Sequence, residues 1–140
     1  MKKISFDFDD TLADSISVPY FGLDGEMYYA ELYFPIEKIF KFLKKCYDKN
    51  YDCIILTARE ENDKNINIIN KFLKDYGAFD MISKVYFTNH KYKGDFIKKH
   101  NINIDLHIDD DNDHLESLRE YKIIGISSMY ESFIYENLNI

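Results

Sequence analysis

Apolar residues follow two alternating periodicities along the chain. Short apolar runs of the kind found in buried parallel strands lie at 3–8, 52–57, 85–88, 104–108 and 123–126. The segments between them repeat apolar residues at helical spacing, which predicts helices at 35–49, 61–76, 95–100 and 112–121. Strands that alternate with helices predict an α/β fold, a doubly wound, Rossmann-like parallel sheet with right-handed crossovers and helices on both faces.

Turn-forming residues refine this pattern. Pro35 suits the first turn of a helix, and Gly77 is a plausible residue to end one. The segment 15–34 departs from the alternation, since it is rich in aromatic residues and carries Asp24-Gly25, the signal of a hairpin turn. We predict a short flap there, inserted after the first strand, near the functional end of the sheet. A loop whose aromatic residues cover the edge of the sheet is the alternative.

The composition bounds the class of protein. The chain has 140 residues, of which 46% are hydrophobic, as expected of one folded domain spanning 1–140 with the flap inside it. The net charge of −7 argues against a nucleic-acid binder with a basic surface. It does not exclude a nucleotide or a nucleic-acid end as substrate, because a bound metal could neutralise the phosphate.

Cysteine usage and the chain start bear on location. Cys46 and Cys53 form no metal-ligand or redox pattern, so both are predicted to be reduced core residues. No apolar run reaches spanning length, and the first residues lead into a strand and not into a signal peptide. A cytoplasmic protein with no membrane partner is expected, either cellular or encoded by a virus.

Two carboxylates follow the first predicted strand. Asp7 and Asp9 are two residues apart, a spacing that on a strand places both side chains on one face. Like charges so close oppose each other's ionisation. The pair therefore indicates a cation, a substrate or a chemical role, unless it belongs to a solvated turn.

A second acidic cluster follows a later strand. Four aspartates stand within 109–113, and capping of the next helix would explain only one or two of them. In a doubly wound sheet both clusters, together with Thr57 and Arg59, fall at the carboxyl ends of the strands, where ligands bind. Carboxylates from two strands are suitable ligands for Mg²⁺.

These residues together resemble the haloacid dehalogenase (HAD) superfamily of phosphohydrolases. The segment 7–12 is similar to the DxDxT loop of the family, 54–57 to its strand ending in threonine, and 108–113 to its acidic motif. A lysine before a helix, Lys93 or the less favoured Lys91, matches the remaining motif. Asp10 departs from the pattern, since the family often has glycine there.

The resemblance implies a role for each carboxylate. Asp7 would be the nucleophile and form an aspartyl-phosphate, and Asp9 would act as general acid and then as general base. Mg²⁺ would be bound by Asp7, by the backbone carbonyl of Asp9 and by Asp109. The acidic motif can be read in two registers, in which the partner of Asp109 is either Asp110 or Asp113.

The resemblance also implies a set of phosphate-binding residues. Thr57, Thr11 and Lys93 would contact the phosphoryl oxygens, with Lys93 stabilising their charge. Arg59 could grip a substrate phosphate or a second anionic group; alternatively it is a surface residue paired with Glu60 or Glu61. The histidines show no ligand spacing and are expected to be structural or surface residues: His90, His100, His107 and His114.

The substrate is less well defined. Between the first two motifs there is room for the flap and one helix only, so the large cap domains of the family are expected to be absent. An open site admits a phosphorylated small molecule, a nucleotide or a nucleic-acid end, and the motifs resemble those of deoxyribonucleotidases and polynucleotide-end phosphatases. A homo-oligomer could supply the missing cap. The alternatives to an enzyme are a receiver-like module that accepts phosphate and an inactive HAD-fold interaction protein.

Overall fold

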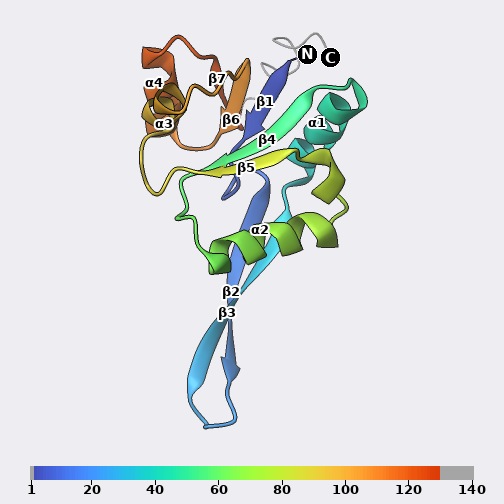
Figure 1. Ribbon diagram of the computed structural model, residues 1–140. Helices are drawn as coiled ribbons and strands as arrows, with labels where there is room; N and C mark the ends of the chain where they lie inside the picture. Colours follow the sequence, from blue (N-terminus) through green and yellow to red (C-terminus); the bar gives the residue numbers. More distant parts are fainter. Residues whose placement is uncertain (1, 130–140) are drawn as a thin grey trace.

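The computed structural model describes residues 2–129 and contains a five-stranded, all-parallel sheet (Figure 1). The strand order is β5-β4-β1-β6-β7. The strands are β1 (Lys3–Phe6), β4 (Asp52–Thr57), β5 (Lys84–Phe87), β6 (Leu106–Asp109) and β7 (Gly125–Ser127). The chain starts in the middle of the sheet, adds β4 and β5 on one side, then crosses back to add β6 and β7 on the other. The predicted doubly wound topology is confirmed, and β1 lies at the point where the strand order reverses.

Helices cover both faces of the sheet (Figure 1). They are α1 (Glu37–Asp48), α2 (Asp63–Asp75), α3 (Lys93–Lys99) and α4 (Asn112–Glu120), with a short 3₁₀ turn, η1 (Phe79–Met81). The apolar faces of α1 and α2 join one large core, whereas α3 and α4 pack over a smaller core on the opposite face. Within residues 2–129, no helix is both long and apolar enough to cross a bilayer.

The main core includes both cysteines. Cys46 of α1 and Cys53 of β4 are buried free thiols, as predicted. A hydrogen bond with Cys53 and burial hold the pKa of the Cys46 thiol far above its ordinary range. The Cys46 thiol is therefore not prepared for nucleophilic chemistry.

The first strand ends earlier than predicted. β1 stops at Phe6, and the chain turns through Asp10, whose φ of 60° is left-handed. The carbonyl of Phe8 accepts N–H groups of Leu12 (3.1 Å) and Ala13 (2.9 Å), which closes the turn. The prediction that Asp7 and Asp9 share one face of a strand is wrong, because both residues lie in this loop. Asp7 is buried, whereas the side chain of Asp9 is 44% exposed.

The inserted segment is a hairpin of β2 (Ala13–Phe21) and β3 (Met27–Pro35) that projects from the sheet (Figure 1). Gly25, with a φ of 79°, lies in the predicted turn. Most of both strands is exposed, so the alternative of a loop covering the sheet edge is wrong. Pro35 is the last residue of β3 and pairs with Ala13, and α1 begins two residues later. The prediction that Pro35 lies in the first helical turn is also wrong, because Pro35 is paired with Ala13 in the hairpin.

Candidate active site

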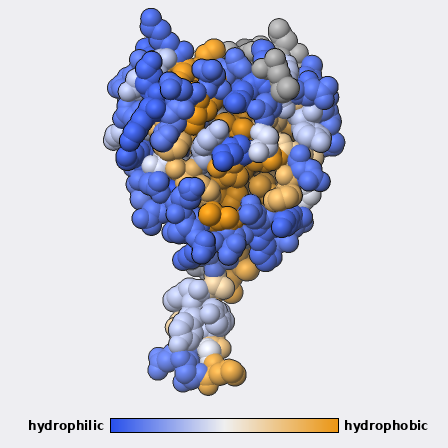
Figure 2. Space-filling view, viewed as in Figure 1, coloured by the Kyte–Doolittle hydropathy of each residue, from blue (hydrophilic) through white to orange (hydrophobic). Residues whose placement is uncertain are grey.

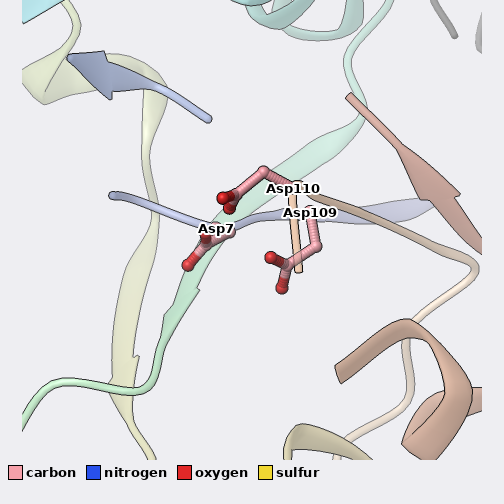
Figure 3. A group of neighbouring side chains, drawn as sticks. All are labelled: Asp7, Asp109 and Asp110. Atoms are coloured by element: carbon pink, nitrogen blue, oxygen red, sulfur yellow. The ribbon is translucent and has the colours of Figure 1, made fainter. Parts of the chain in front are cut away.

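Three carboxylates converge at the carboxyl ends of β1 and β6 (Figure 3). One oxygen from each of Asp7, Asp109 and Asp110 lies within 4.8 Å of the others. The strands bring them together, since Phe6 of β1 is in register with Ile108 of β6. Of the two registers of the acidic motif, the geometry favours Asp110. Asp113 lies exposed in the first turn of α4 and is not part of the group.

A buried lysine joins two of these carboxylates. Lys93, the first residue of α3, has no exposed surface, and its Nζ is 2.8 Å from Oδ1 of Asp7. The same ammonium group forms an ion pair with Oδ2 of Asp109. Lys91, the less favoured lysine, is exposed on the preceding loop. The structure therefore brings Lys93 to the carboxylates.

Gly94 allows α3 to bring Lys93 to this position. A Cβ atom on Gly94 would lie 2.2 Å from the backbone oxygen of Ser117 in α4. The N–H of Gly94 donates to Oγ of Ser117 over 2.9 Å. A glycine is required here because the two helices approach each other at this residue.

The two buried aspartates differ in their affinity for a proton. Burial, and then the nearby charge of Asp109, raise the pKa of Asp7 well above its ordinary value, although Lys93 opposes the shift. Burial would also raise the pKa of Asp109, but the hydrogen bond from His107 and the charge of Lys93 bring it far below its ordinary value. In the metal-free protein a proton therefore binds Asp7 in preference to Asp109.

His107 is a site residue that sequence reasoning missed. It is fully buried on β6, with Nε2 2.8 Å from Oδ2 of Asp109 and Nδ1 2.6 Å from Oγ of Ser5. Burial lowers the pKa of His107 to about 4, so the ring is neutral at pH 7. An ionised carboxylate only accepts hydrogen bonds, so Nε2 carries the proton and the hydroxyl of Ser5 donates to Nδ1. The available signal was the i, i+2 spacing of His107 and Asp109, which places both on one face of a strand.

Two threonines also lie at this edge of the sheet. The hydroxyl of Thr11 is 3.3 Å from Oδ2 of Asp7 and 3.2 Å from Oδ1 of Asp110. Thr57 ends β4 and is buried, and its Oγ1 accepts the backbone N–H of Arg59 over 3.2 Å. The structure thus places Thr11 on the carboxylates and Thr57 on the neighbouring strand.

Arg59 binds the second aspartate of the DxDxT-like loop. Its Nε and Nη2 donate to the two carboxylate oxygens of Asp9, both over 2.8 Å. Nη1 donates to Oδ1 of Asn65 (3.0 Å) and Nη2 to the hydroxyl of Tyr33 (3.1 Å). The guanidinium carbon lies 5.4 Å from the ring centre of Phe8. Arg59 therefore links the loop to α2 and to the hairpin.

This geometry corrects one sequence interpretation. The alternative in which Arg59 is a surface residue paired with Glu60 or Glu61 is wrong, because its guanidinium is partly buried and forms a bidentate pair with Asp9. Asp9 was expected to act as general acid and base. In this structure both of its carboxylate oxygens accept hydrogen bonds from Arg59.

The donor set suits a hard divalent cation. Three carboxylates meet one ammonium group, which leaves an excess of negative charge at a partly buried point. Such charge is costly unless it is compensated. Carboxylate oxygens are the ligands that Mg²⁺ prefers. The residues present therefore fit the ion that the family resemblance implied.

Comparison with solved structures supports the fold. A HAD-superfamily hydrolase from Ehrlichia chaffeensis matches with a TM-score of 0.60 at 13% identity, over 97% of this chain and 98% of that protein. The 3-deoxy-D-manno-octulosonate 8-phosphate phosphatase of Moraxella catarrhalis, solved with magnesium, phosphate and KDO, matches with a TM-score of 0.50 at 20% identity, over 86% of this chain. A Vibrio cholerae protein assigned the same activity has a TM-score of 0.47 at 20% identity, also over 86% of this chain.

The comparisons establish the fold and leave the substrate open. The chain has the fold of the HAD-superfamily hydrolase from Ehrlichia chaffeensis. It spans 62–63% of the length of the Vibrio and Moraxella proteins. No family model and no curated protein matches the sequence. The expected similarity to deoxyribonucleotidases and polynucleotide-end phosphatases has no support among these structures and stays a prediction.

Proposed function

We propose that this protein is a Mg²⁺-dependent phosphomonoester hydrolase that uses Asp7 as its nucleophile. One observation carries the proposal: the buried ammonium group of Lys93 joins Asp7 to Asp109 at the carboxyl edge of a HAD-type sheet. A buried cation beside a carboxylate that has a strongly shifted pKa is typical of a functional site.

The metal site would be formed by three side chains and one backbone group. Asp7, Asp109 and Asp110 would supply carboxylate oxygens, and Asp9 its backbone carbonyl. Bound there, Mg²⁺ would neutralise charge on the carboxylates and on the substrate phosphate, which otherwise repel each other.

Asp7 is held in a defined orientation for attack. Lys93 binds its Oδ1 and Thr11 its Oδ2, so the carboxylate cannot rotate freely. In the first step an Asp7 oxygen bonds to phosphorus, the bond from phosphorus to the leaving oxygen breaks, and Asp9 gives that oxygen a proton. Water then attacks phosphorus, Asp9 takes up its proton, and phosphate leaves Asp7. Thr57 would hydrogen-bond the phosphoryl oxygens during both steps.

Asp9 must separate from Arg59 before it can serve as the proton carrier. Both of its oxygens accept hydrogen bonds from the guanidinium group, and a bidentate pair of this kind is made by the ionised carboxylate, which has no proton to give a leaving group. An anionic group of the substrate would compete for Arg59 and so release Asp9. This exchange would give Arg59 the anion-binding role expected from the sequence.

The substrate would be a phosphorylated small molecule, a nucleotide or a nucleic-acid end. The only insertion between β1 and β4, besides α1, is the slender hairpin, so no cap domain encloses the carboxylates in the described residues. The neighbour from Moraxella catarrhalis holds phosphate and KDO, which agrees with a phosphorylated small molecule. A cytoplasmic location stays a prediction.

A homo-oligomer would use the exposed apolar side chains of the hairpin. Phe21 is 72% and Tyr29 65% exposed, and Leu23 at the tip is fully exposed. Figure 2 shows the hairpin as a narrow stem with apolar atoms at its end. A second copy covering these side chains could also complete an open site. Light scattering of the wild type and of Leu23→Asp tests this, and a monomeric wild type would contradict it.

One assay tests the proposed function against its alternatives. The protein is incubated with Mg²⁺ and p-nitrophenyl phosphate, and then with a panel of nucleoside monophosphates and sugar phosphates. We expect repeated turnover that stops when EDTA removes the metal. A single stoichiometric phosphorylation would indicate a receiver-like module instead, and no reaction by the folded protein would indicate a binding protein.

A further inference from the structure

A chain of buried polar side chains runs from the middle of the sheet to the candidate metal site. Ser5 of β1, His107 of β6 and Asp109 at the end of β6 are all fully buried. Ser5 and His107 are register partners on adjacent parallel strands. Hydrogen bonds of 2.6 Å and 2.8 Å link the three residues in order.

We propose that His107 is a positioning residue for the metal ligand Asp109. Its imidazole would fix the orientation of the carboxylate, and Ser5 would fix which ring nitrogen donates. The inference rests on the proposed function only in that it takes Asp109 to be a Mg²⁺ ligand.

The hydrogen bonds of Asp109 explain why His107 matters. Oδ2 accepts from Nε2 of His107 and from Nζ of Lys93, while Oδ1 accepts the backbone N–H of Asp111 over 3.0 Å. A carboxylate offers about four acceptor positions, so these three donors hold its plane and leave one position for a metal. Groups that hydrogen-bond a metal-binding carboxylate hold its orientation, and their removal typically weakens metal binding.

His107 differs from the other side-chain donor in its partners. Lys93 divides its ammonium group between Asp7 and Asp109, and both of those contacts lie where the phosphoryl group would bind. His107 donates to Asp109 alone, and its contact lies on the strand and away from Asp7. It can therefore hold Asp109 in the same orientation before and after substrate binds.

Two amide substitutions at His107 distinguish a residue that orients Asp109 from one that only fills space in the core. Gln at position 107 can place an N–H donor where Nε2 of the histidine lies, within reach of Asp109. Asn is one methylene shorter and reaches only toward Ser5. His107→Gln and His107→Asn therefore form a matched pair, with His107→Leu as the variant that has no donor.

The measurement is Mg²⁺ affinity by titration calorimetry, with no substrate present and with thermal unfolding in EDTA to verify folding. We expect His107→Gln to bind Mg²⁺ within about 3-fold of the wild type. His107→Asn and His107→Leu should bind about 10- to 100-fold more weakly. Equal affinity of the Gln and Asn variants would overturn the proposal, since only one of them can reach Asp109.

A second measurement needs no variant. Nitrogen NMR of the histidine-labelled wild type should show His107 protonated at Nε2, and protonation at Nδ1 would overturn the assigned direction of the hydrogen bonds. The Mg²⁺ titrations and the turnover assay can fail independently of each other. If the wild type binds Mg²⁺ and the Gln and Asn variants differ, but no phosphate ester is hydrolysed, the positioning role stands and the hydrolase assignment fails. If the wild type binds no Mg²⁺, both fail.

Discussion

The carboxyl edge of the sheet buries titratable side chains, whereas the β2–β3 hairpin exposes large apolar side chains. At the sheet edge, titratable groups are buried and have close partners: Lys93 contacts Asp7 and Asp109, and His107 contacts Asp109. In the hairpin, large apolar side chains such as Phe21 and Tyr29 lie in solvent. Within residues 2–129, no buried side-chain nitrogen or oxygen lacks a hydrogen-bond partner.

The difference concerns how each region is compensated. Burying charge is costly, and the cost is offset only by close partners. The sheet edge provides part of this compensation within the chain itself, and a bound Mg²⁺ would neutralise the negative charge that remains. The exposed hairpin has the character of a surface for association, since contiguous exposed apolar side chains commonly mark interaction sites.

The most severe change to the sheet edge is Lys93→Met. It leaves two buried carboxylates close together without their cation, which should lower the free energy of unfolding by about 3–5 kcal/mol in metal-free protein at pH 7. The rate of phosphate release should fall on the order of 10²–10³-fold. Urea denaturation and a turnover assay measure the two effects.

Lys71→Met is the matched control for this substitution. Lys71 forms an equally close ion pair with Asp75, but on the exposed face of α2. Its loss should leave the unfolding midpoint unchanged, since exposed pairs contribute little. Equal destabilisation by both substitutions would contradict the contrast between buried and exposed charge.

Phenylalanine truncations compare the two regions directly. Phe8 is fully buried, with its ring 5.2 Å from that of Phe72 in an edge-to-face contact. Phe8→Ala should lower the free energy of unfolding by about 3–5 kcal/mol because it leaves a cavity. Phe21→Ala in the hairpin should change it by less than about 0.5 kcal/mol. Denaturation at low protein concentration measures both, and a large effect of Phe21→Ala would show that the hairpin packs on the body.

The pH dependence of stability tests the neutral His107. Burial lowers its pKa from 6.5 to about 4, so the folded state favours the neutral ring. The stability that this ring contributes is present above pH 6.5 and is lost as the pH falls toward 4, up to about 3 kcal/mol. The raised pKa of Asp7 acts in the opposite direction, but it is common to the wild type and His107→Gln. The difference between these two proteins in EDTA should therefore shrink or reverse toward pH 4; a constant difference would contradict a neutral buried ring.

A smaller effect is expected from Gly94→Ala. The added Cβ would meet the backbone of Ser117, so α3 must move away from α4 at a cost of about 1–3 kcal/mol. Because Lys93 precedes this residue, turnover should fall even where the protein remains folded. Thermal unfolding and activity together measure this, and full activity would show that the position of Lys93 does not depend on the close contact between the helices.

Much of the fold could be predicted from local patterns. Apolar runs and helical periodicity predicted the order of strands and helices, and Asp24-Gly25 predicted the hairpin turn. The prediction from local patterns failed at the end of the first strand, where the backbone turns earlier than the apolar run suggests. Asp10 adopts a left-handed conformation that no periodicity reveals, and the strand has already ended at Phe6, so Asp7 and Asp9 lie in the loop and not on the strand.

The candidate site could be predicted in part. Asp7 and Asp109 were expected together because both lie at strand ends in a doubly wound sheet, and Lys93 was expected beside them because of the resemblance to the HAD superfamily. The partner of Arg59 is Asp9, 50 residues away, and its identity depends on side-chain geometry between two loops. His107 was expected to be a structural or surface residue because the histidines show no ligand spacing. Its contact with Ser5 depends on strand register, which a single sequence does not show.

Asp7 is proposed to attack phosphorus through a carboxylate oxygen, and replacing its carboxylate with an amide tests this role most directly. Asp7→Asn keeps the shape of the side chain and removes the anionic oxygen. Steady-state phosphate release with Mg²⁺ is measured for the wild type and for pure, folded Asp7→Asn protein. We expect repeated turnover by the wild type and none above background by the variant; measurable turnover by Asp7→Asn would show that Asp7 is not the nucleophile.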